Sequence, residues 1–298
     1  CSLKACGHIG ARDKVKEIHT EIKKQALLEK DPVVGNTLVD MYAKHGFLSA
    51  AQEVFDILPS RDIAAWTALI SGYVQAGHGK EALKCFEQMQ FEGVFADALT
   101  YICGLKACGM MGAIDKGEEM HAEIERHGFL ADDLIVGNTL VDMYAKCGAL
   151  GKAQQVFGKL HVRNVVSWTT LMAGYVHHGE SENVFQIFEM MLEEGIRPDP
   201  ISFVVVLSAC SRQGLFQKTQ TYFESMSKMY GIVPAIEHHT CMIDLLSRMG
   251  RLGEAFAMVQ KIPLNNDKDT TIWQPVLSAC AMVGNLEFGK LAFEHVFK

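Results

Sequence analysis

The sequence VGNTLVDMYAK at residues 34–44 occurs a second time, letter for letter, at residues 136–146. The segment LKACG at residues 3–7 returns after the same shift of 102 residues, at residues 105–109. Within this long period, glycines recur every 31 to 36 residues, at Gly10, Gly46, Gly77, Gly112, Gly148, Gly179, Gly214, Gly250 and Gly284. Repeats of this length are typical of stacked supersecondary units that share one continuous core. We therefore predict an elongated array of about nine repeats.

Each repeat consists of two amphipathic segments with a glycine between them. In residues 134–146 and 150–160 the apolar residues, among them Tyr144 and Phe157, follow the spacing of a helix. Gly148 lies between the two segments, where a left-handed turn residue commonly ends a helix. We therefore predict an all-α fold, a right-handed superhelical α-solenoid of helix-turn-helix repeats with one concave face.

The composition narrows the classes of function. The chain has 298 residues, and its hydrophobic fraction of 49% is enough for a continuous core. It has no apolar run of about 18 residues, so we expect no membrane partner. Its nine cysteines are scattered along the repeats, which indicates reduced thiols rather than a disulfide framework. The net charge of −7 counts against a nucleic-acid partner, unless binding uses a local basic stripe.

The chain lacks the motifs of an enzyme. His19 with Glu21, and His121 with Glu123, match the H-x-E half of a zinc deaminase signature, but no Pro-Cys-x-x-Cys follows either pair. Both pairs share one repeat position, so we predict that they are helix-surface residues. The sequence also has no C-x-x-C and no H-E-x-x-H pattern. We expect no catalytic residues, no metal site, no cofactor and no small-molecule substrate.

The repeats alternate between lengths of 31, 35 and 36 residues, and the 35-residue repeats end in EALKCFEQMQFEGVFAD and NVFQIFEMMLEEGIRPD. This pattern resembles the pentatricopeptide repeat proteins of the plant PLS class. The predicted repeats are residues 1–31 (partial long), 32–62 (short), 63–97 (35 residues), 98–133 (long), 134–164 (short), 165–199 (35 residues), 200–235 (long) and 236–269 (terminal short), followed by a partial extension motif at 270–298.

The resemblance implies a function. Such proteins bind single-stranded RNA in plant organelles with one base per repeat, and members with extension motifs typically specify a cytidine for C-to-U editing. They carry or recruit a zinc deaminase domain. We therefore expect this chain to bind single-stranded RNA in a mitochondrion or chloroplast, with a deaminase domain or editing cofactor proteins as further partners.

In this family, position 5 and the last residue of each repeat read the base. U and G present a ring N–H, which an Asp carboxylate can accept, whereas A and C present a bare ring nitrogen that suits the Asn amide. The resemblance adds that Asn at position 5 goes with pyrimidines and Thr with purines. The predicted pairs are Asn36 with Asp62 (U), Thr67 with Asp97 (G), Asn138 with Asn164 (C or U), Thr169 with Asp199 (G) and Thr240 with Asp269 (G).

The long repeats depart from this pattern, because they combine Ile102 with Asp133 and Val204 with Ala235. An aliphatic side chain at position 5 cannot hydrogen-bond a base, so we expect these repeats to accept any nucleotide. Since the family binds RNA parallel to the chain, the predicted site is 5′-UGNYGNG-3′, with the edited cytidine a few nucleotides further 3′.

Two more positions have roles in the family. Position 2 stacks on bases, and here it holds Val33, Ala64, Leu99, Ile135, Val166 and Ile201, with Glu237 as the exception. Position 13 contacts phosphate, and here it holds Lys44, Lys146 and Arg248 in three of the repeats. Core packing is the alternative role of the apolar residues, and a solvated surface is the alternative for the cations.

A protein-interaction scaffold of the tetratricopeptide type is the alternative function. Such arrays are also helical hairpins, but they keep a uniform length of about 34 residues and bind peptides. The alternating lengths and the paired Asn or Thr with Asp favour RNA.

Overall fold

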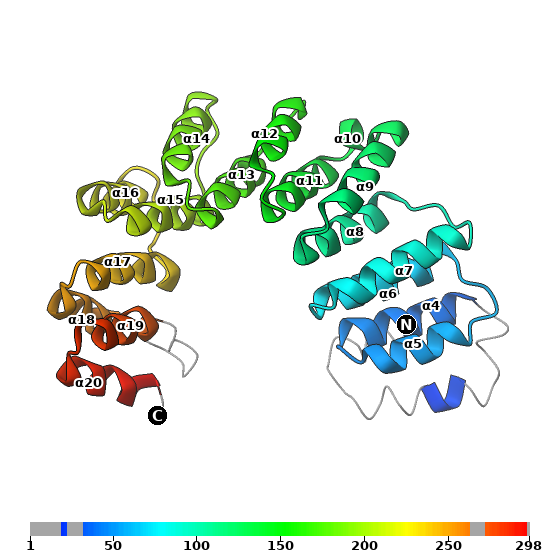
Figure 1. The fold of residues 1–298 in the computed structure, drawn as a ribbon, viewed down its shortest axis with the longest axis horizontal. Coiled ribbons are helices and arrows are strands. Elements are labelled where there is room, and N and C mark those ends of the chain that lie inside the picture. Colours follow the sequence, from blue (N-terminus) through cyan, green and yellow to red (C-terminus); the bar gives the residue numbers. More distant parts are fainter. Residues whose placement is uncertain (1–18, 23–31, 263–271, 297–298) are drawn as a thin grey trace. The chain divides into compact units, whose positions relative to one another are not determined.

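The computed structural model describes residues 19–22, 32–262 and 272–296, and every regular element in these ranges is a helix (Figure 1). The chain divides into two compact units, Cys1–Val162 and Arg163–Lys298. Within each unit, helices that are consecutive along the chain stack as antiparallel pairs. The all-helical fold of stacked helix pairs is therefore confirmed.

Between residues 32 and 162, the N-terminal unit contains four helix pairs and one additional short helix. These are α4 (Pro32–Lys44), α5 (Leu48–Asp56), α6 (Ile63–Gln75), α7 (Gly79–Phe91), α8 (Ala98–Met111), α9 (Ile114–His127), α10 (Phe129–Asp132), α11 (Leu134–Lys146) and α12 (Leu150–Lys159). The first helices of the pairs, α4, α6, α8 and α11, pack side by side in chain order. Each second helix packs against its own first helix, and α5, α7 and α9 also pack against the next one.

The C-terminal unit repeats this arrangement. Its helices are α13 (Val165–His177), α14 (Ser181–Glu193), α15 (Pro200–Gln213), α16 (Phe216–Lys228), α17 (Ile236–Arg248), α18 (Leu252–Lys261), α19 (Gln274–Val283) and α20 (Leu286–Val296). The first helices α13, α15, α17 and α19 again lie in a row. We call the row of first helices in either unit its first-helix layer.

Small residues allow the turns and the close packing. Gly77 ends α6 with φ of 82°, a left-handed conformation that few other residues adopt, and His78 then donates its backbone N–H to the Tyr73 carbonyl at 2.8 Å. Gly72 lies where α6 meets α4, since a Cβ at this position would overlap the Ala43 Cβ and lie 3.1 Å from its Cα. Glycine therefore sets both the bend and the spacing of these helices.

His121 does not lie on an open surface, contrary to the prediction. Its Nδ1 is 2.9 Å from the hydroxyl of Tyr144, and the two rings meet edge to face at 5.6 Å. The side chain of His121 is half-buried between α9 and α11 of the next repeat. His19 makes the same contact with Tyr42. The prediction was wrong because helical periodicity does not show which face of a second helix the next repeat covers.

Burial changes the acid–base properties of this contact. It lowers the pKa of the His121 imidazole, and it is the main cause that raises the pKa of Tyr144 to about 12. Folding therefore favours the uncharged forms of both side chains. This identifies His121 as part of the packing between repeats.

Candidate nucleic-acid interface

The last residue of a predicted repeat begins the first helix of the next one. Asp62 accepts the backbone N–H of Ala65 at 2.9 Å at the start of α6. At the corresponding places Asp97 accepts from Thr100 at 2.8 Å, Asn164 from Ser167 at 3.0 Å and Asp199 from Ser202 at 2.8 Å. Each of these side chains is an N-cap, which fixes its orientation at the helix end. This capping role was not predicted, although Asp or Asn before an amphipathic segment is a recognisable signal for it.

Asn36 and Asp62 are in direct contact across two neighbouring first helices. The Asn36 amide donates from Nδ2 to both carboxylate oxygens of Asp62, at 2.8 Å each. Asp62 is exposed and Asn36 is half-buried. The structure therefore brings together the two residues of the predicted U pair.

Thr67 and Asp97 are connected through a third residue. The hydroxyl oxygens of Thr67 and Thr100 are 2.7 Å apart, and the Thr100 hydroxyl donates to Asp97 Oδ1 at 2.7 Å. Thr100 belongs to the repeat after Thr67 and is fully buried. A threonine side chain is shorter than asparagine, so a bridging hydroxyl is what links it to the carboxylate.

The C-terminal unit has the same arrangement at Thr169 and Asp199. Thr169 Oγ1 is 3.0 Å from Ser202 Oγ, and the Ser202 hydroxyl donates to Asp199 Oδ1 at 2.7 Å. Thr169 Oγ1 is also 2.7 Å from the backbone carbonyl oxygen of Val165. The predicted guanine pairs of the two units thus share one hydrogen-bonded pattern.

Two other predicted pairs are seen only in part. Asn138 and Asn164 belong to different compact units. Asn138 is buried, and its Oδ1 has no hydrogen-bond partner among the described residues. Thr240 is half-buried and donates to the Ile236 carbonyl at 2.8 Å, whereas Asp269 lies outside the described residues.

The long repeats offer no polar pair. Ile102 is buried and Val204 is half-buried, while Asp133 serves as the N-cap of α11 by accepting the Ile135 N–H at 2.7 Å. Ala235 has no side-chain acceptor, and the ring nitrogen Nδ1 of His238 accepts its backbone N–H at 3.1 Å instead. Asp133 is therefore an N-cap without a polar partner at position 5.

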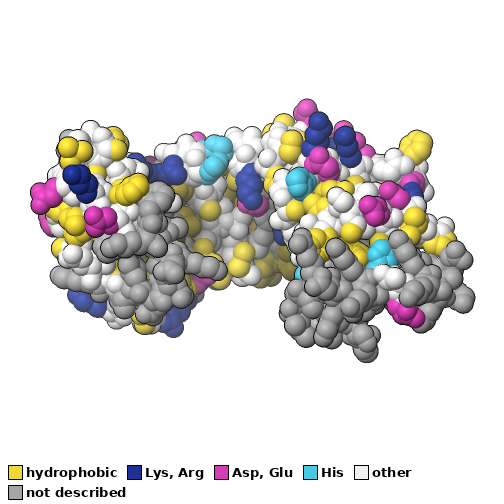
Figure 2. Space-filling model, turned by 90° about the horizontal axis from the view of Figure 1, so that it is seen from below, with side chains coloured by type: hydrophobic (Ala, Val, Ile, Leu, Met, Phe, Trp, Pro, Cys, Tyr) yellow, Lys and Arg dark blue, Asp and Glu magenta, His cyan; other side chains and the backbone are white. Residues whose placement is uncertain are grey.

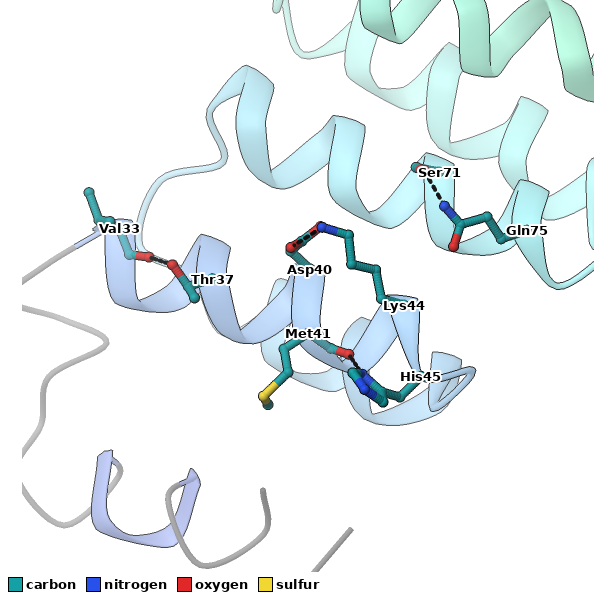
Figure 3. Close-up of polar contacts among 8 residues, drawn as sticks. All are labelled: Val33, Thr37, Asp40, Met41, Lys44, His45, Ser71 and Gln75. Atoms are coloured by element: carbon teal, nitrogen blue, oxygen red, sulfur yellow. Dashed lines mark hydrogen bonds and ion pairs between the residues drawn. The ribbon is translucent and has the colours of Figure 1, made fainter. Parts of the chain in front are cut away.

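The position-2 residues are exposed, although all six are apolar. Ala64 is exposed, and the exposed fractions of the others are 67% for Val33, 57% for Leu99, 63% for Ile135, 52% for Val166 and 62% for Ile201. Core packing, the alternative role, is therefore wrong for these residues. Each lies one turn before position 5 on its first helix, where a flat apolar partner could cover it, and Figure 3 shows Val33 pointing away from its helix. Glu237, the exception, is also exposed.

The three predicted phosphate cations each have a carboxylate partner. Lys44 Nζ is 2.7 Å from Asp40 Oδ2, Lys146 Nζ is 2.7 Å from Asp142 Oδ2, and Arg248 Nε is 2.9 Å from Asp244 Oδ2. Figure 3 shows Lys44 folded back along α4 toward Asp40, while Gln75 at the same position of α6 donates to Ser71 at 3.3 Å. The four-residue spacing of each ion pair could have been read from the sequence.

These ion pairs reduce the local positive charge. All three cations remain more than half exposed, and an exposed pair contributes only about 0–1 kcal/mol of stability. On the face in view in Figure 2, basic side chains lie beside acidic ones in several places. A phosphate would therefore have to replace the aspartate as the partner of each cation.

Among the described residues, no three or more His, Cys, Asp and Glu side chains are grouped as a metal site would need. The helices in the same ranges are all too short or too polar to cross a bilayer.

Comparison with protein families gives matches along much of the chain. The PPR repeat family profile matches residues 61–110 and 163–212. The PPR repeat profile matches residues 36–63, 138–165, 201–230 and 237–266. Together the two profiles cover most of the first helices described above.

Three Arabidopsis thaliana proteins illustrate the sequence similarity. A putative pentatricopeptide repeat-containing protein is 38% identical over 296 residues, which are 99% of this chain and 39% of that protein. A putative mitochondrial one is 38% identical over 271 residues (91% and 43%), and a chloroplastic one is 38% identical over 286 residues (95% and 43%). The chain thus spans about two fifths of the length of these relatives.

Solved structures support the fold. The crystal structure of the pentatricopeptide repeat protein PPR10 in complex with an 18-nt psaJ RNA element matches with a TM-score of 0.72 at 15% identity, over 95% of this chain and 42% of that one. PPR10 from maize, in a further crystal structure, matches with a TM-score of 0.54 at 18% identity, over 95% of this chain and 46% of that one.

Proposed function

The chain belongs to the pentatricopeptide repeat family, and we propose that it binds single-stranded RNA along its first-helix layers, one base per repeat. The observation that carries the proposal is the contact between Asn36 and Asp62, together with the bridged contacts of Thr67 with Asp97 and Thr169 with Asp199. These polar groups recur at the same helix positions, each beside an exposed apolar residue. That combination suits a base, which has a hydrogen-bonding edge and two apolar faces.

N-capping alone accounts for part of the polar pattern. A cap requires only Asp or Asn at the start of a helix, and it places no requirement on position 5 of the preceding repeat. The polar residues at position 5 in the predicted reading repeats, and the aliphatic ones in the long repeats, are therefore the additional feature that favours base reading. Asp133, which caps α11 without such a partner, has the capping role alone.

The proposed target is 5′-UGNYGNG-3′, read parallel to the chain. Asp62, Asp97 and Asp199 accept the ring N–H of U or G, and the long repeats leave their nucleotides unread. Lys44, Lys146 and Arg248 contact phosphates after exchanging their aspartate partners.

We also propose that the bound site directs C-to-U editing in an organelle. The resemblance to the PLS class and to its extension motif supports this, and the mitochondrial and chloroplastic names of two relatives support the compartment. The chain itself is proposed to select RNA, while a deaminase domain or an editing cofactor protein supplies the chemistry.

Binding to short RNAs tests the proposal. Fluorescence anisotropy would compare the target with RNAs that carry A in place of G at the second or fifth base. We expect each substitution to weaken binding by about 1–3 kcal/mol, and changes at the third or sixth base to have little effect. Equal affinity for all these RNAs would contradict the proposal.

A further inference from the structure

We propose that Thr100 and Ser202 are positioning residues that fix the hydrogen-bonding state of the two guanine-reading pairs. Neither was predicted as a site residue, and both lie one repeat after the threonine that they contact. The proposal rests on the proposed function, because it explains how the pairs of Thr67 with Asp97 and Thr169 with Asp199 would prefer guanine.

The positions of the protons follow from the hydrogen bonds around Thr100. An ionised carboxylate can only accept, so the single Thr100 hydroxyl proton is used in its 2.7 Å bond to Asp97 Oδ1. Thr67 Oγ1 is 2.7 Å from Thr100 Oγ1, and this bond must therefore use the proton of Thr67. The Thr67 oxygen then offers only lone pairs to a ligand.

The hydroxyl protons around Ser202 can be assigned in the same way. The Ser202 hydroxyl proton is used in the 2.7 Å bond to Asp199 Oδ1. The hydroxyl proton of Thr169 can go to Ser202 or to the Val165 carbonyl, which is 2.7 Å away. In either case the Thr169 oxygen offers only lone pairs to a ligand, as the Thr67 oxygen does in the other unit.

The carboxylates of these pairs are also limited to accepting. Asp97 Oδ1 already accepts two bonds from Thr100, one from the backbone N–H and one from the hydroxyl. The Oδ2 atom of Asp97 has no hydrogen-bond partner within the described part of the chain, and it is the oxygen left for a ligand. Each pair of Thr and Asp thus presents two acceptors and no donor.

A pair of side chains that presents only hydrogen-bond acceptors is complementary to one base, guanine. Guanine presents two adjacent donors on its Watson–Crick edge, the ring N1–H and the 2-amino group. Adenine and cytosine place an amino donor beside a bare ring nitrogen, and uracil has one N–H between two carbonyls. The bridging hydroxyl therefore turns a threonine that could donate or accept into a group that favours guanine.

The uracil-reading pair has no bridging hydroxyl. Asn36 reaches Asp62 directly, and the residue at the position equivalent to Thr100 is Ala65, which has no hydroxyl. In these three pairs, each of which lies within one compact unit, a bridging hydroxyl accompanies threonine and is absent with asparagine.

The test uses the whole chain with the variants Thr100→Val and Thr100→Ser. Binding is measured to target RNAs with guanosine, inosine or adenosine at the second base, where inosine lacks only the 2-amino group. Wild type should bind guanosine most tightly. Thr100→Val should lower the guanosine preference over inosine and adenosine by about tenfold at this base alone, which is the loss expected for one oriented hydrogen bond. Thr100→Ser should retain the preference.

Ser202→Ala and Ser202→Thr repeat the test at the fifth base in the other unit, and thermal unfolding reports the folding of each variant. A Thr100→Val chain that selects guanosine as strongly as wild type overturns the inference while the proposed function stands. An equal loss of affinity for all three bases assigns Thr100 a purely structural role and also overturns it. A wild type without base preference overturns the proposed function, and this inference with it.

Discussion

The amide nitrogen of Asn36 lies 2.8 Å from both carboxylate oxygens of Asp62, although Asn36 lies on α4, Asp62 precedes α6, and the two residues are 26 residues apart in the sequence. Asp62 is held at the same time by the Ala65 backbone N–H, as the N-cap of α6. A side chain fixed by two partners loses little further conformational freedom when it meets a base. The contact would therefore preorganise the pair for the proposed binding of a base.

The Asp199→Asn substitution should change the base preference of its repeat from G toward A. An amide can donate to the bare ring nitrogen of adenine, whereas the carboxylate accepts the N–H of guanine, and the exchange should alter discrimination by about 1–3 kcal/mol. Asparagine is also a good N-cap, so the thermal stability should change little. Binding to RNAs with G or A at the fifth base measures the shift, and an unchanged preference would show that Asp199 does not read this base.

Asp133→Asn is the matched control. Asp133 caps α11 through the Ile135 N–H, as Asp199 caps α15, but position 5 of its repeat is Ile102. We expect this substitution to leave the preference at every base unchanged. A change at the third base would show that the cap alone is sufficient to read RNA.

Helix pairing and most helix starts follow from the sequence because glycine, capping residues and the 3.6-residue period are local signals. The bridge from Thr67 through Thr100 to Asp97 could not be predicted in the same way. It joins residues 33 positions apart, and it depends on the side-chain rotamers of helices in two repeats. The burial of His121 escaped prediction for the same reason, because the neighbouring repeat determines which face is covered.

Lys146→Ala should weaken binding about equally for all RNA sequences. A phosphate contact carries no base information, and its loss should reduce the slope of log affinity against log salt by about one unit. Lys152→Ala is the control, since Lys152 is similarly exposed but lies on the second helix α12, where it pairs with Glu118. A loss that depends on the base sequence would rule out a phosphate role for Lys146.

Asp142→Asn should have the opposite effect. It removes the carboxylate that is 2.7 Å from Lys146 Nζ, so the ammonium group is available to a phosphate without an exchange of partners. We expect tighter binding by up to about 1 kcal/mol, the upper range for an exposed ion pair, together with a steeper salt dependence. Weaker binding of this variant would indicate that Asp142 itself contacts the RNA.

Gly72→Ala should destabilise the N-terminal unit. The added Cβ would overlap the Ala43 side chain and press on its backbone, and overpacking of this kind costs about 1–3 kcal/mol. In Gly151→Ala, by contrast, the new methyl group meets nothing within 4 Å, so the better helix propensity of alanine should stabilise α12 by about 0.5–1 kcal/mol. Chemical denaturation of both variants checks the difference, and equal effects would contradict the close approach of α4 and α6.

The stability of the fold should decrease in mild acid because of His121. Burial lowers the pKa of its imidazole in the folded state, so protonation favours the unfolded chain. The stability that the neutral His121 side chain contributes is present above the ordinary histidine pKa of about 6.5 and is lost as the pH falls below it. Unfolding midpoints at pH 7.5 and 5.5 measure this loss, and it should be smaller in His121→Gln. The same loss in both proteins would show that His121 is not its source.

Selection from a pool of random RNA would show whether successive repeats read successive bases, because it makes no assumption about the target. We expect the bound fraction to be enriched in 5′-UGNYGNG-3′, with the third and sixth positions left random and with the second G shifted toward A when Asp199→Asn is used. A bound fraction with no shared sequence, or one whose sequence does not respond to Asp199→Asn, would contradict the claim that paired side chains on successive first helices read successive bases.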